Sequence, residues 1–362
     1  MIKNVLKVHR FDLKDIDLIK RYENLHRKCE FAFFQQSVAW AHSIKDFGPD
    51  VPIFLLCEIN NIDVAGIPIY LFSGKYGNIM TSIPQPGPVG GLFHADNISN
   101  DVKNTVYKSI FDEVIKISRE FKCLLFSTNT NQIFDDSLIY KKMIRPQYIL
   151  NNFTQYINLQ ENQSRSTSLN HNVNRSKKIG LEFLIDDNLF YFNEWYNIHI
   201  KRSKEIGIYP LNQDLLQKLL QNSNNVKLAC VFLKKKIISG CIFIFHKKIL
   251  DLYMISYDSL YKQFKPNYFC IDNIISIAKN LNIQYFNWQS SNYISSGVYN
   301  FKKSWGSKHS DYQIITKIFT NISELRKIGI KNIMNAYPNH YLLPWSAFKK
   351  YNRQKIFYKG EK

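Results

Sequence analysis

The sequence predicts an α+β protein of two tandem domains, each with a mixed, mostly antiparallel sheet flanked by helices. Its length of 362 residues exceeds that of a typical domain with a single hydrophobic core. A hydrophobic content of 45% and an aromatic content of 15% are sufficient for two packed interiors. One order of strand-like and helix-like segments also occurs in both halves, and this repetition favours two similar domains.

The first half begins with three strand-like segments. Residues 52–59, 64–72 and 78–83 are rich in apolar and β-branched side chains and are separated by turn residues. In residues 102–121, apolar side chains recur at helical spacing, which predicts a helix. The apolar run 123–127 then predicts a fourth strand.

The second half repeats this order. Residues 227–233, 237–245 and 249–257 predict three strands joined by lysine-containing turns. A helix is expected to start near Pro266, because proline is favoured in the first turn of a helix. Residues 284–288 predict the strand that follows it.

A polar stretch rich in serine and asparagine, residues 161–174, separates the two repeats and is typical of a linker. We therefore expect an N-terminal domain over residues 1–160 and a C-terminal domain with the catalytic cleft over residues 161–320. Residues 321–362 should form a C-terminal helix, at 321–337, and a basic tail.

Four short segments contain clusters of aromatic, basic, proline or glycine residues that the helical and strand-like patterns do not account for. Two lie in the first half: FFQQSVAW at residues 33–40, whose aromatic residues are expected on the core side of a helix, and the proline- and glycine-rich loop IPQPGPVGG at residues 83–91. The third is the basic segment VNRSKKIGL at residues 173–181. The fourth is NWQSS at residues 287–291, followed by SGVYNFKKSWG at residues 296–306.

In their order and separations these segments resemble the motifs of the FemAB-like acyltransferases, a branch of the GNAT superfamily. The resemblance spans roughly residues 30–315. It implies tandem GNAT-like domains, because a three-stranded meander followed by a helix and a parallel strand is the GNAT core plan. It also implies acyl transfer to an amine, and it points to Lys302, since the functional lysine of the family directly follows the phenylalanine of this motif.

Lys302 is the predicted catalytic residue. Acyl transfer to an amine requires a neutral nucleophile, stabilisation of the developing oxyanion and a proton acceptor. A lysine among Tyr299, Phe301 and Trp305 supplies a positive charge for the oxyanion, which is the preferred role. It would act as a base only if desolvation lowered its pKa well below the usual value of about 10.4. We expect Lys302 and Lys303 on a strand, where neighbouring side chains point to opposite faces.

The predicted substrate-binding residues come from these motifs and from the end of the strand at 249–257. They are Gln36, Arg175, Lys178, Tyr257, Asn287, Ser291, Tyr299, Phe301 and Lys303. For the charged pair on the basic segment, a solvated helix face is the alternative explanation. Two departures from the family pattern stand out. Asn287 replaces the usual aspartate, and Gln289-Ser290-Ser291 replaces Gly-Arg-Ser.

The net charge of +19, from 48 basic and 29 acidic residues, favours an anionic partner. Candidates are tRNA, a carrier protein, coenzyme A, a pyrophosphate-linked lipid or an anionic membrane surface; a general lysine bias explains the charge equally well. The six cysteines are scattered without a CxxC pair, so no metal site is expected. We expect a cytoplasmic protein, at most peripheral at the inner face of the plasma membrane, without a tightly bound cofactor.

These observations favour an N-acyltransferase of cell-envelope biosynthesis. The co-substrate would be an aminoacyl-tRNA, an acyl carrier protein or acyl-CoA, and the acceptor an amine on a glycan, peptidoglycan or lipid precursor. The alternative is a non-catalytic binding module for an anionic partner such as RNA or an acidic glycan. Asn287 and Ser290 favour that alternative, because both depart from the family motif.

Overall fold

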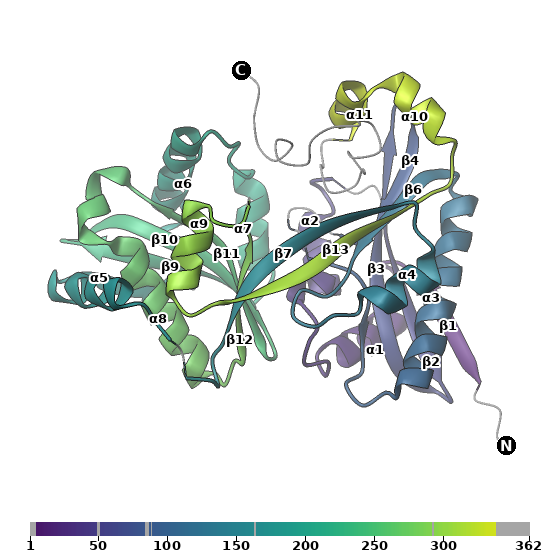
Figure 1. Ribbon diagram of the computed structural model, residues 1–362, viewed down its shortest axis with the longest axis horizontal. Helices are drawn as coiled ribbons and strands as arrows, with labels where there is room; N and C mark the ends of the chain where they lie inside the picture. Colours follow the sequence, from purple (N-terminus) through teal and green to yellow (C-terminus); the bar gives the residue numbers. More distant parts are fainter. Residues whose placement is uncertain are drawn as a thin grey trace. The chain divides into compact units, whose positions relative to one another are not determined.

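The structure is a computed structural model that describes residues 5–48, 51–83, 87, 89–162, 164–291 and 293–337. These residues form two compact units (Figure 1). Unit 1 contains the chain up to Phe153 and again from Ser310, and unit 2 contains Thr154–His309. The chain therefore passes between the units within two strands, β7 (Tyr148–Asn158) and β13 (Lys308–Ile318). The expected division was a single one near residue 160, with residues 310–320 in the second domain; in the structure, residues from Ser310 on belong to unit 1.

In unit 1 the strands are ordered β1-β2-β3-β4-β6-β13, with β5 beside β3. β2, β3 and β4 form an antiparallel meander, β6 lies parallel to β4, and β13 is antiparallel to β6. The strands are β1 (Leu6–Phe11), β2 (Val51–Ile59), β3 (Ile62–Gly74), β4 (Gly77–Thr81), β5 (Phe93–His94) and β6 (Cys123–Asn129).

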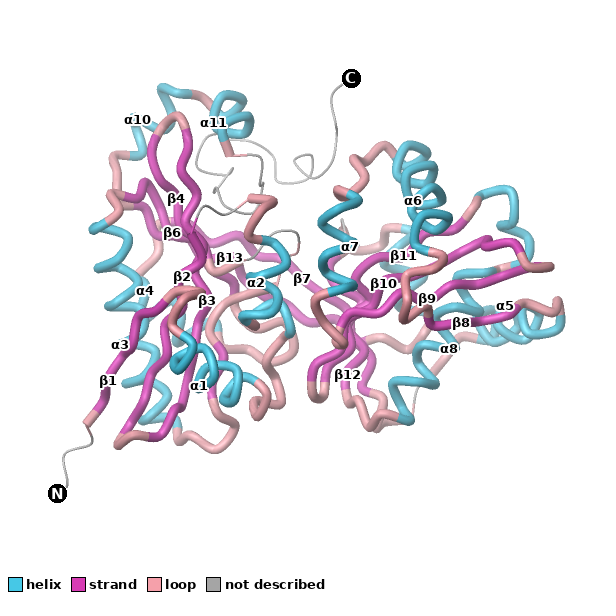
Figure 2. Tube along the Cα trace, turned by 180° about the vertical axis from the view of Figure 1, so that it is seen from behind, coloured by secondary structure: helices cyan, strands magenta, loops and turns pink. Residues whose placement is uncertain are grey.

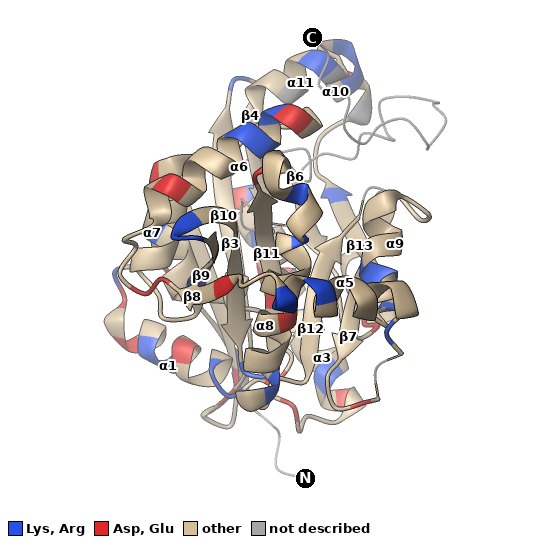
Figure 3. Ribbon diagram, turned by 90° about the vertical axis from the view of Figure 1, so that its left-hand side faces the viewer, with Lys and Arg blue, Asp and Glu red and all other residues tan. Residues whose placement is uncertain are grey.

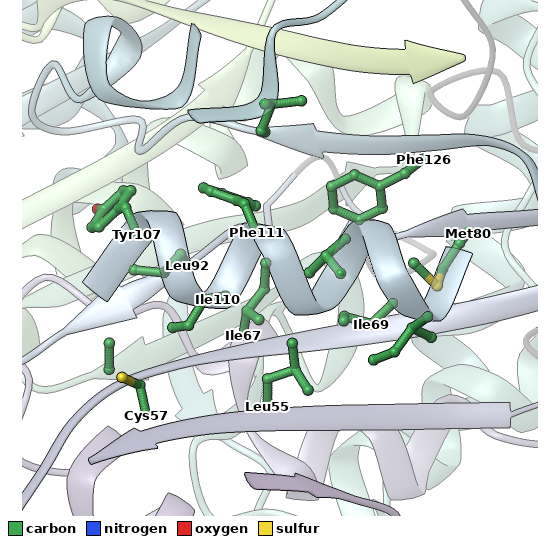
Figure 4. Packing of buried hydrophobic residues seen from close by; sticks show 14 of the residues in the cluster. Leu55, Cys57, Ile67, Ile69, Met80, Leu92, Tyr107, Ile110, Phe111 and Phe126 are labelled. Carbon is green, nitrogen blue, oxygen red and sulfur yellow. The ribbon is translucent and has the colours of Figure 1, made fainter. Parts of the chain in front are cut away.

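The helices of unit 1 cover both faces of its sheet. They are α1 (Ile16–His26), α2 (Val38–Ile44), α3 (Asn100–Glu120), α4 (Ser137–Ile144), α10 (Ile322–Ile328) and α11 (Ile330–Ala336). The apolar stripe of α3 packs on one face of β2 and β3 (Figure 4). On the other face, a Cβ added to Gly66 of β3 would lie 2.7 Å from the ring of Tyr22, so only glycine allows α1 this close.

Unit 2 repeats the plan, with strand order β7-β12-β11-β10-β9-β8. β9, β10 and β11 form the meander, β12 lies parallel to β11, and β7 is antiparallel to β12. The strands are β8 (Glu182–Ile185), β9 (Val226–Leu233), β10 (Lys236–His246), β11 (Ile249–Tyr257) and β12 (Tyr285–Ser290). The predicted repetition of meander, helix and strand is confirmed.

The helices of unit 2 also lie on both faces of its sheet (Figure 2). They are α5 (Thr167–Lys178), α6 (Phe192–Ile206), α7 (Gln213–Gln221), α8 (Pro266–Asn280) and α9 (Gly297–Ser304), with a 3-10 turn, η2, at Ser259–Phe264. α5 and α8 share one apolar cluster with the sheet. Trp195 of α6 packs on Gly240 of β10, where a Cβ would come within 2.4 Å of the indole ring.

Three local predictions differ from the structure. Residues 33–40 form a 3-10 turn, η1 (Phe34–Gln36), and then α2, because Ser37 caps α2 by accepting the Trp40 N–H. Residues 321–337 form two short helices rather than one, since Gly329 takes a φ of 85° between them. Lys302 lies on a helix, α9, and not on a strand.

Candidate functional site

The helix α9 carries the lysine pair that the motif singled out. Ser296 caps its first turn by accepting the Tyr299 N–H at 3.1 Å, and this cap starts a helix where aromatic residues had suggested a strand. Successive residues of a helix lie about 100° apart around its axis. Lys302 is therefore buried and Lys303 exposed. The two lysine side chains point in different directions, as predicted, but because they lie on a helix and not on a strand.

The ammonium group of Lys302 is held by two backbone carbonyls at the end of β12. Its Nζ lies 2.9 Å from the Gln289 oxygen and 2.9 Å from the Ser290 oxygen, and the residue is only 6% exposed. Burial lowers the pKa of Lys302 to about 7. This is the condition under which the sequence analysis allowed Lys302 to act as a base.

Two successive carbonyls reach one lysine because β12 is distorted there. In a regular strand, consecutive carbonyls point in opposite directions. The register between β12 and β7 shifts between Asn287 and Ser290, as in a β-bulge, and Gln289 takes a φ of 57°. Such a backbone is unfavourable for a residue with a side chain and persists only where neighbouring contacts impose it.

Asn287 provides those contacts. Its Oδ1 accepts the Gln289 N–H at 3.2 Å, a side-chain turn that holds the next residues, and also accepts the Thr154 hydroxyl at 2.7 Å. Its Nδ2 donates to Asp251 Oδ1 at 2.7 Å. Asp251 lies directly opposite Asn287 in the parallel β11–β12 ladder and is 2% exposed.

Asp251 was missed by the sequence analysis. It is the third residue of a mostly apolar strand and belongs to no motif, so only the strand pairing shows that it meets Asn287. The β11–β12 ladder ends at this pair, and both strands continue beyond it, β11 to Tyr257 and β12 to Ser290. Lys302 therefore contacts β12 just beyond the point where the two parallel strands cease to pair.

Aromatic side chains fix α9 against the sheet. Phe301 packs edge-on against Tyr268 and Trp288, at 5.2 and 6.1 Å between ring centroids, and Trp305 is fully buried beside them. The guanidinium of Arg165 lies 5.0 Å from the Trp305 ring centroid. Phe301 thus has a packing role, and its aromatic neighbours limit the freedom of the Lys302 backbone.

Tyr299 and Ser291 meet at one residue of β7. Gln155 donates its Nε2 to the Tyr299 carbonyl at 3.2 Å, and the Ser291 hydroxyl donates to Gln155 Oε1 at 3.4 Å. Gln155 is 1% exposed and was not singled out from the sequence. The structure therefore brings Asn287, Ser291, Tyr299 and Phe301 together around the β12–α9 junction.

The other predicted residues lie apart from this junction. Tyr257, at the end of β11, has the Arg202 guanidinium of α6 4.8 Å from its ring centroid. Arg175 and Lys178 are exposed on α5, whereas Lys177 of the same helix pairs with Asp272 at 2.7 Å. Figure 3 shows the basic residues of this helix in blue. Their role in substrate binding stays a prediction.

Gln36 belongs to unit 1, and its amide is engaged with the backbone. Its Oε1 accepts the Phe33 N–H at 2.7 Å, and its Nε2 donates to the carbonyls of Gly90 and Gly91 at 3.1 and 3.0 Å. These bonds anchor the end of the 83–91 loop, of which residues 84–86 and 88 lie outside the described part of the chain.

In the described part of the chain, no group of three or more His, Cys, Asp or Glu side chains is arranged to hold a metal ion. All six cysteines are buried and free. Among the described helices, none has the length and apolar character needed to cross a membrane.

Comparison with known proteins identifies the class of fold. No family model matches the sequence, and no curated protein matches it. Among solved structures, FemX aligns with a TM-score of 0.70 at 9% identity, over 89% of this chain and 99% of FemX. L-PGS from Bacillus licheniformis aligns with a TM-score of 0.54 at 11% identity, over 91% of this chain and 98% of its own.

A tandem GNAT protein from the clavulanic acid biosynthesis pathway aligns with a TM-score of 0.50 at 7% identity, over 88% of this chain and 99% of its own. The chain thus has a tandem GNAT fold. More particularly, its fold is similar to that of FemX, which confirms the fold that the motif resemblance implied.

Proposed function

We propose that this protein is an N-acyltransferase in which Lys302 accepts the proton of the attacking amine. The observation that carries the proposal is the buried Lys302 amine, whose pKa of about 7 leaves a large neutral fraction at neutral pH. A lysine that served only to bind an anion would gain nothing from losing its charge. The FemAB-like fold supports the proposal by analogy.

The hydrogen bonds of Lys302 suit a base. A neutral amine has two N–H groups and one lone pair, and the Gln289 and Ser290 carbonyls accept both N–H groups. The lone pair then occupies the remaining tetrahedral direction. In the protonated form, a third N–H takes that direction and can stabilise an oxyanion or return the proton to the leaving group.

The proposed reaction joins an acceptor amine to the carbonyl carbon of an activated acyl group. The C–N bond forms as the ester C–O bond of an aminoacyl-tRNA, or the C–S bond of a thioester, breaks. Lys302 takes one proton from the amine and returns it to the departing oxygen or sulfur, which leaves as a hydroxyl or thiol. No oxidant, reductant or metal is required for this balance.

We propose that the donor is an aminoacyl-tRNA, an acyl carrier protein or acyl-CoA. The acceptor is proposed to be an amine of a glycan, peptidoglycan or lipid precursor made at the inner face of the plasma membrane. The net charge of +19 supports anionic substrates and contact with an anionic membrane. FemX and L-PGS have the same fold as this chain, and this likeness supports aminoacyl transfer as the proposed reaction.

To test this, the purified protein is incubated with one donor of each class and a panel of amine acceptors. Acylated products are detected by mass spectrometry. We expect transfer from one donor class, and loss of that transfer in Lys302→Met. A protein that binds RNA or an acidic glycan tightly but transfers no acyl group from any class would instead be the binding module considered above.

A further inference from the structure

We propose that Asp251 is a positioning residue for Lys302, and that its carboxylate is the reason why position 287 is an asparagine. That Asp251 matters for catalysis rests on the proposed function. The fixed arrangement that runs from Asp251 through Asn287 and Gln289 to Lys302 rests only on the hydrogen bonds between these residues.

The first step is the orientation of the Asn287 amide. A carboxylate only accepts hydrogen bonds, so the group of Asn287 that faces Asp251 at 2.7 Å must be the Nδ2 donor. The Oδ1 of the same amide must then face the other way. There it meets two donors, the Thr154 hydroxyl and the Gln289 N–H.

The Asn287 amide also contacts the backbone that holds Lys302. The hydrogen bond from the Gln289 N–H to Asn287 Oδ1 stabilises the positive φ of Gln289, a conformation that is unfavourable for a residue with a side chain. Only in this conformation do the Gln289 and Ser290 carbonyls both reach Lys302 Nζ. Turning the amide over would place two donors against each other at Gln289 and would release the bulge.

Asp251 also accounts for the residue type at position 287. An aspartate there would place two buried carboxylates in contact, because Asp251 is 2% and Asn287 0% exposed. Two carboxylates that share such a site do not both remain ionised. One carboxylate and one amide match the three hydrogen bonds of the Asn287 side chain described above, so Asp251 and Asn287 form a matched pair. The departure from the family motif at 287 therefore keeps the site intact.

The decisive experiment exchanges the two side chains. Asn287→Asp alone creates the carboxylate pair, whereas the double variant Asp251→Asn, Asn287→Asp restores one carboxylate and one amide. In the double variant, the aspartate at 287 still accepts from Thr154 and Gln289, and the asparagine at 251 donates to it. The measured quantity is the Lys302 pKa, read from the 13Cε resonance in protein labelled with 13Cε-lysine. That resonance is identified by its absence in Lys302→Met.

We expect Asn287→Asp to raise the Lys302 pKa by one unit or more, through loosening of the bulge and, at the pH where the second carboxylate ionises, through its added negative charge. The double variant should return the pKa to within a few tenths of the wild-type value. If transfer activity has been found, its single-turnover rate should fall at least tenfold in Asn287→Asp and recover in the double variant. Lys302 titration requires no substrate, so it tests this inference even if the proposed reaction is wrong.

Asp186→Asn is the matched control. Asp186 is another buried carboxylate of unit 2, 5% exposed, and it accepts the N–H groups of Phe190 and Tyr191. This variant should lower stability without moving the Lys302 pKa. If Asn287→Asp also lowered only stability, or if the double variant left the pKa as displaced as the single variant does, Asp251 would be a structural residue and the inference would be overturned.

Discussion

The two units share one plan but differ at the strand that follows the meander and its helix. In unit 1, the β6–β13 ladder runs without a shift of register to Asn129, and the next helix, α4, buries Tyr140. The Tyr140 hydroxyl accepts the Leu92 N–H at 2.7 Å, which closes a loop of its own unit. In unit 2, the corresponding ladder carries a bulge, and α9 buries Lys302 against it.

A second buried group sharpens this contrast. Asp136, just before α4, accepts the Asn131 N–H at 2.9 Å, and burial raises its pKa to about 7. Both units therefore hold an ionisable group at this point of the fold. In unit 1 one oxygen of the carboxyl group accepts a hydrogen bond from its own turn, and the other, Oδ2, is buried. In unit 2 the amine is held by two backbone carbonyls at a bulge and belongs to the motif, so we expect the chemistry in unit 2.

The largest effect should follow removal of the Lys302 amine. Lys302→Met should lower the single-turnover rate of acyl transfer by about 10²–10⁴, the range for loss of a general base. Lys303→Met removes an exposed amine one residue away and should cost less than threefold. Tyr140→Phe, the variant at the corresponding place in unit 1, should lower stability by about 1 kcal/mol and leave the rate unchanged. Similar losses for both lysine variants would show that α9 acts by packing alone.

The pH dependence of the rate should separate the two roles of Lys302. A base works when neutral, so kcat/KM should rise about tenfold per pH unit below the Lys302 pKa of about 7 and level off above it. A charged stabiliser would give the opposite limb, with activity lost as pH rises through about 7. Measurement from pH 5.5 to 9 decides between these roles, provided the acceptor amine is titrated separately.

Stability should depend on pH in the same window. Between about pH 7 and the usual lysine value of 10.5, the unfolded chain holds a proton on Lys302 that the folded protein lacks. Stability from this group therefore rises with pH by up to about 1.4 kcal/mol per unit, and it is constant below about 7. Urea unfolding of wild type and Lys302→Met should diverge in favour of wild type from pH 7 to 10. A constant difference over that range would mean that the amine keeps an ordinary pKa.

The smallest effect should come from the exposed cations of α5. Replacing Arg175 and Lys178 together by alanine should raise KM for an anionic substrate severalfold in low salt, with little change in kcat. The difference should disappear in 0.5 M salt, because exposed charges are screened there (about 4 Å Debye length). If KM is unchanged in low salt, these side chains form a solvated helix face and bind no substrate.

The parts of the fold that were predicted from sequence depend on local patterns. The meander strands, α3 and α8 show their periodicity within a few residues, so their order could be read in both halves. The partners of β7 and β13 could not, because Ser127 of β6 meets Thr316 of β13 across 189 residues. The linker-like composition after residue 160 suggested a domain boundary there, yet the units divide inside two strands.

The site was predicted to a similar extent. Lys302 was found through a motif, but the helix that carries it was not, since a short segment of aromatics and lysines fits a strand or a helix equally well. Asn287 was regarded as a loss because aspartate was expected. Its hydrogen-bonding role depends on Asp251, which the strand register places opposite, and a single sequence contains no record of that register.

Titration of Lys302 in the wild-type protein tests the central claim most directly, because it needs neither donor nor acceptor. The 13Cε resonance that is absent in Lys302→Met is followed from pH 5 to 11 in 13Cε-lysine-labelled protein. A midpoint near 7, with the exposed lysines titrating near their usual value of about 10.4, is the predicted result. A Lys302 midpoint at or above 10 would contradict the account, because the amine would then be fully charged at neutral pH and could not serve as the base.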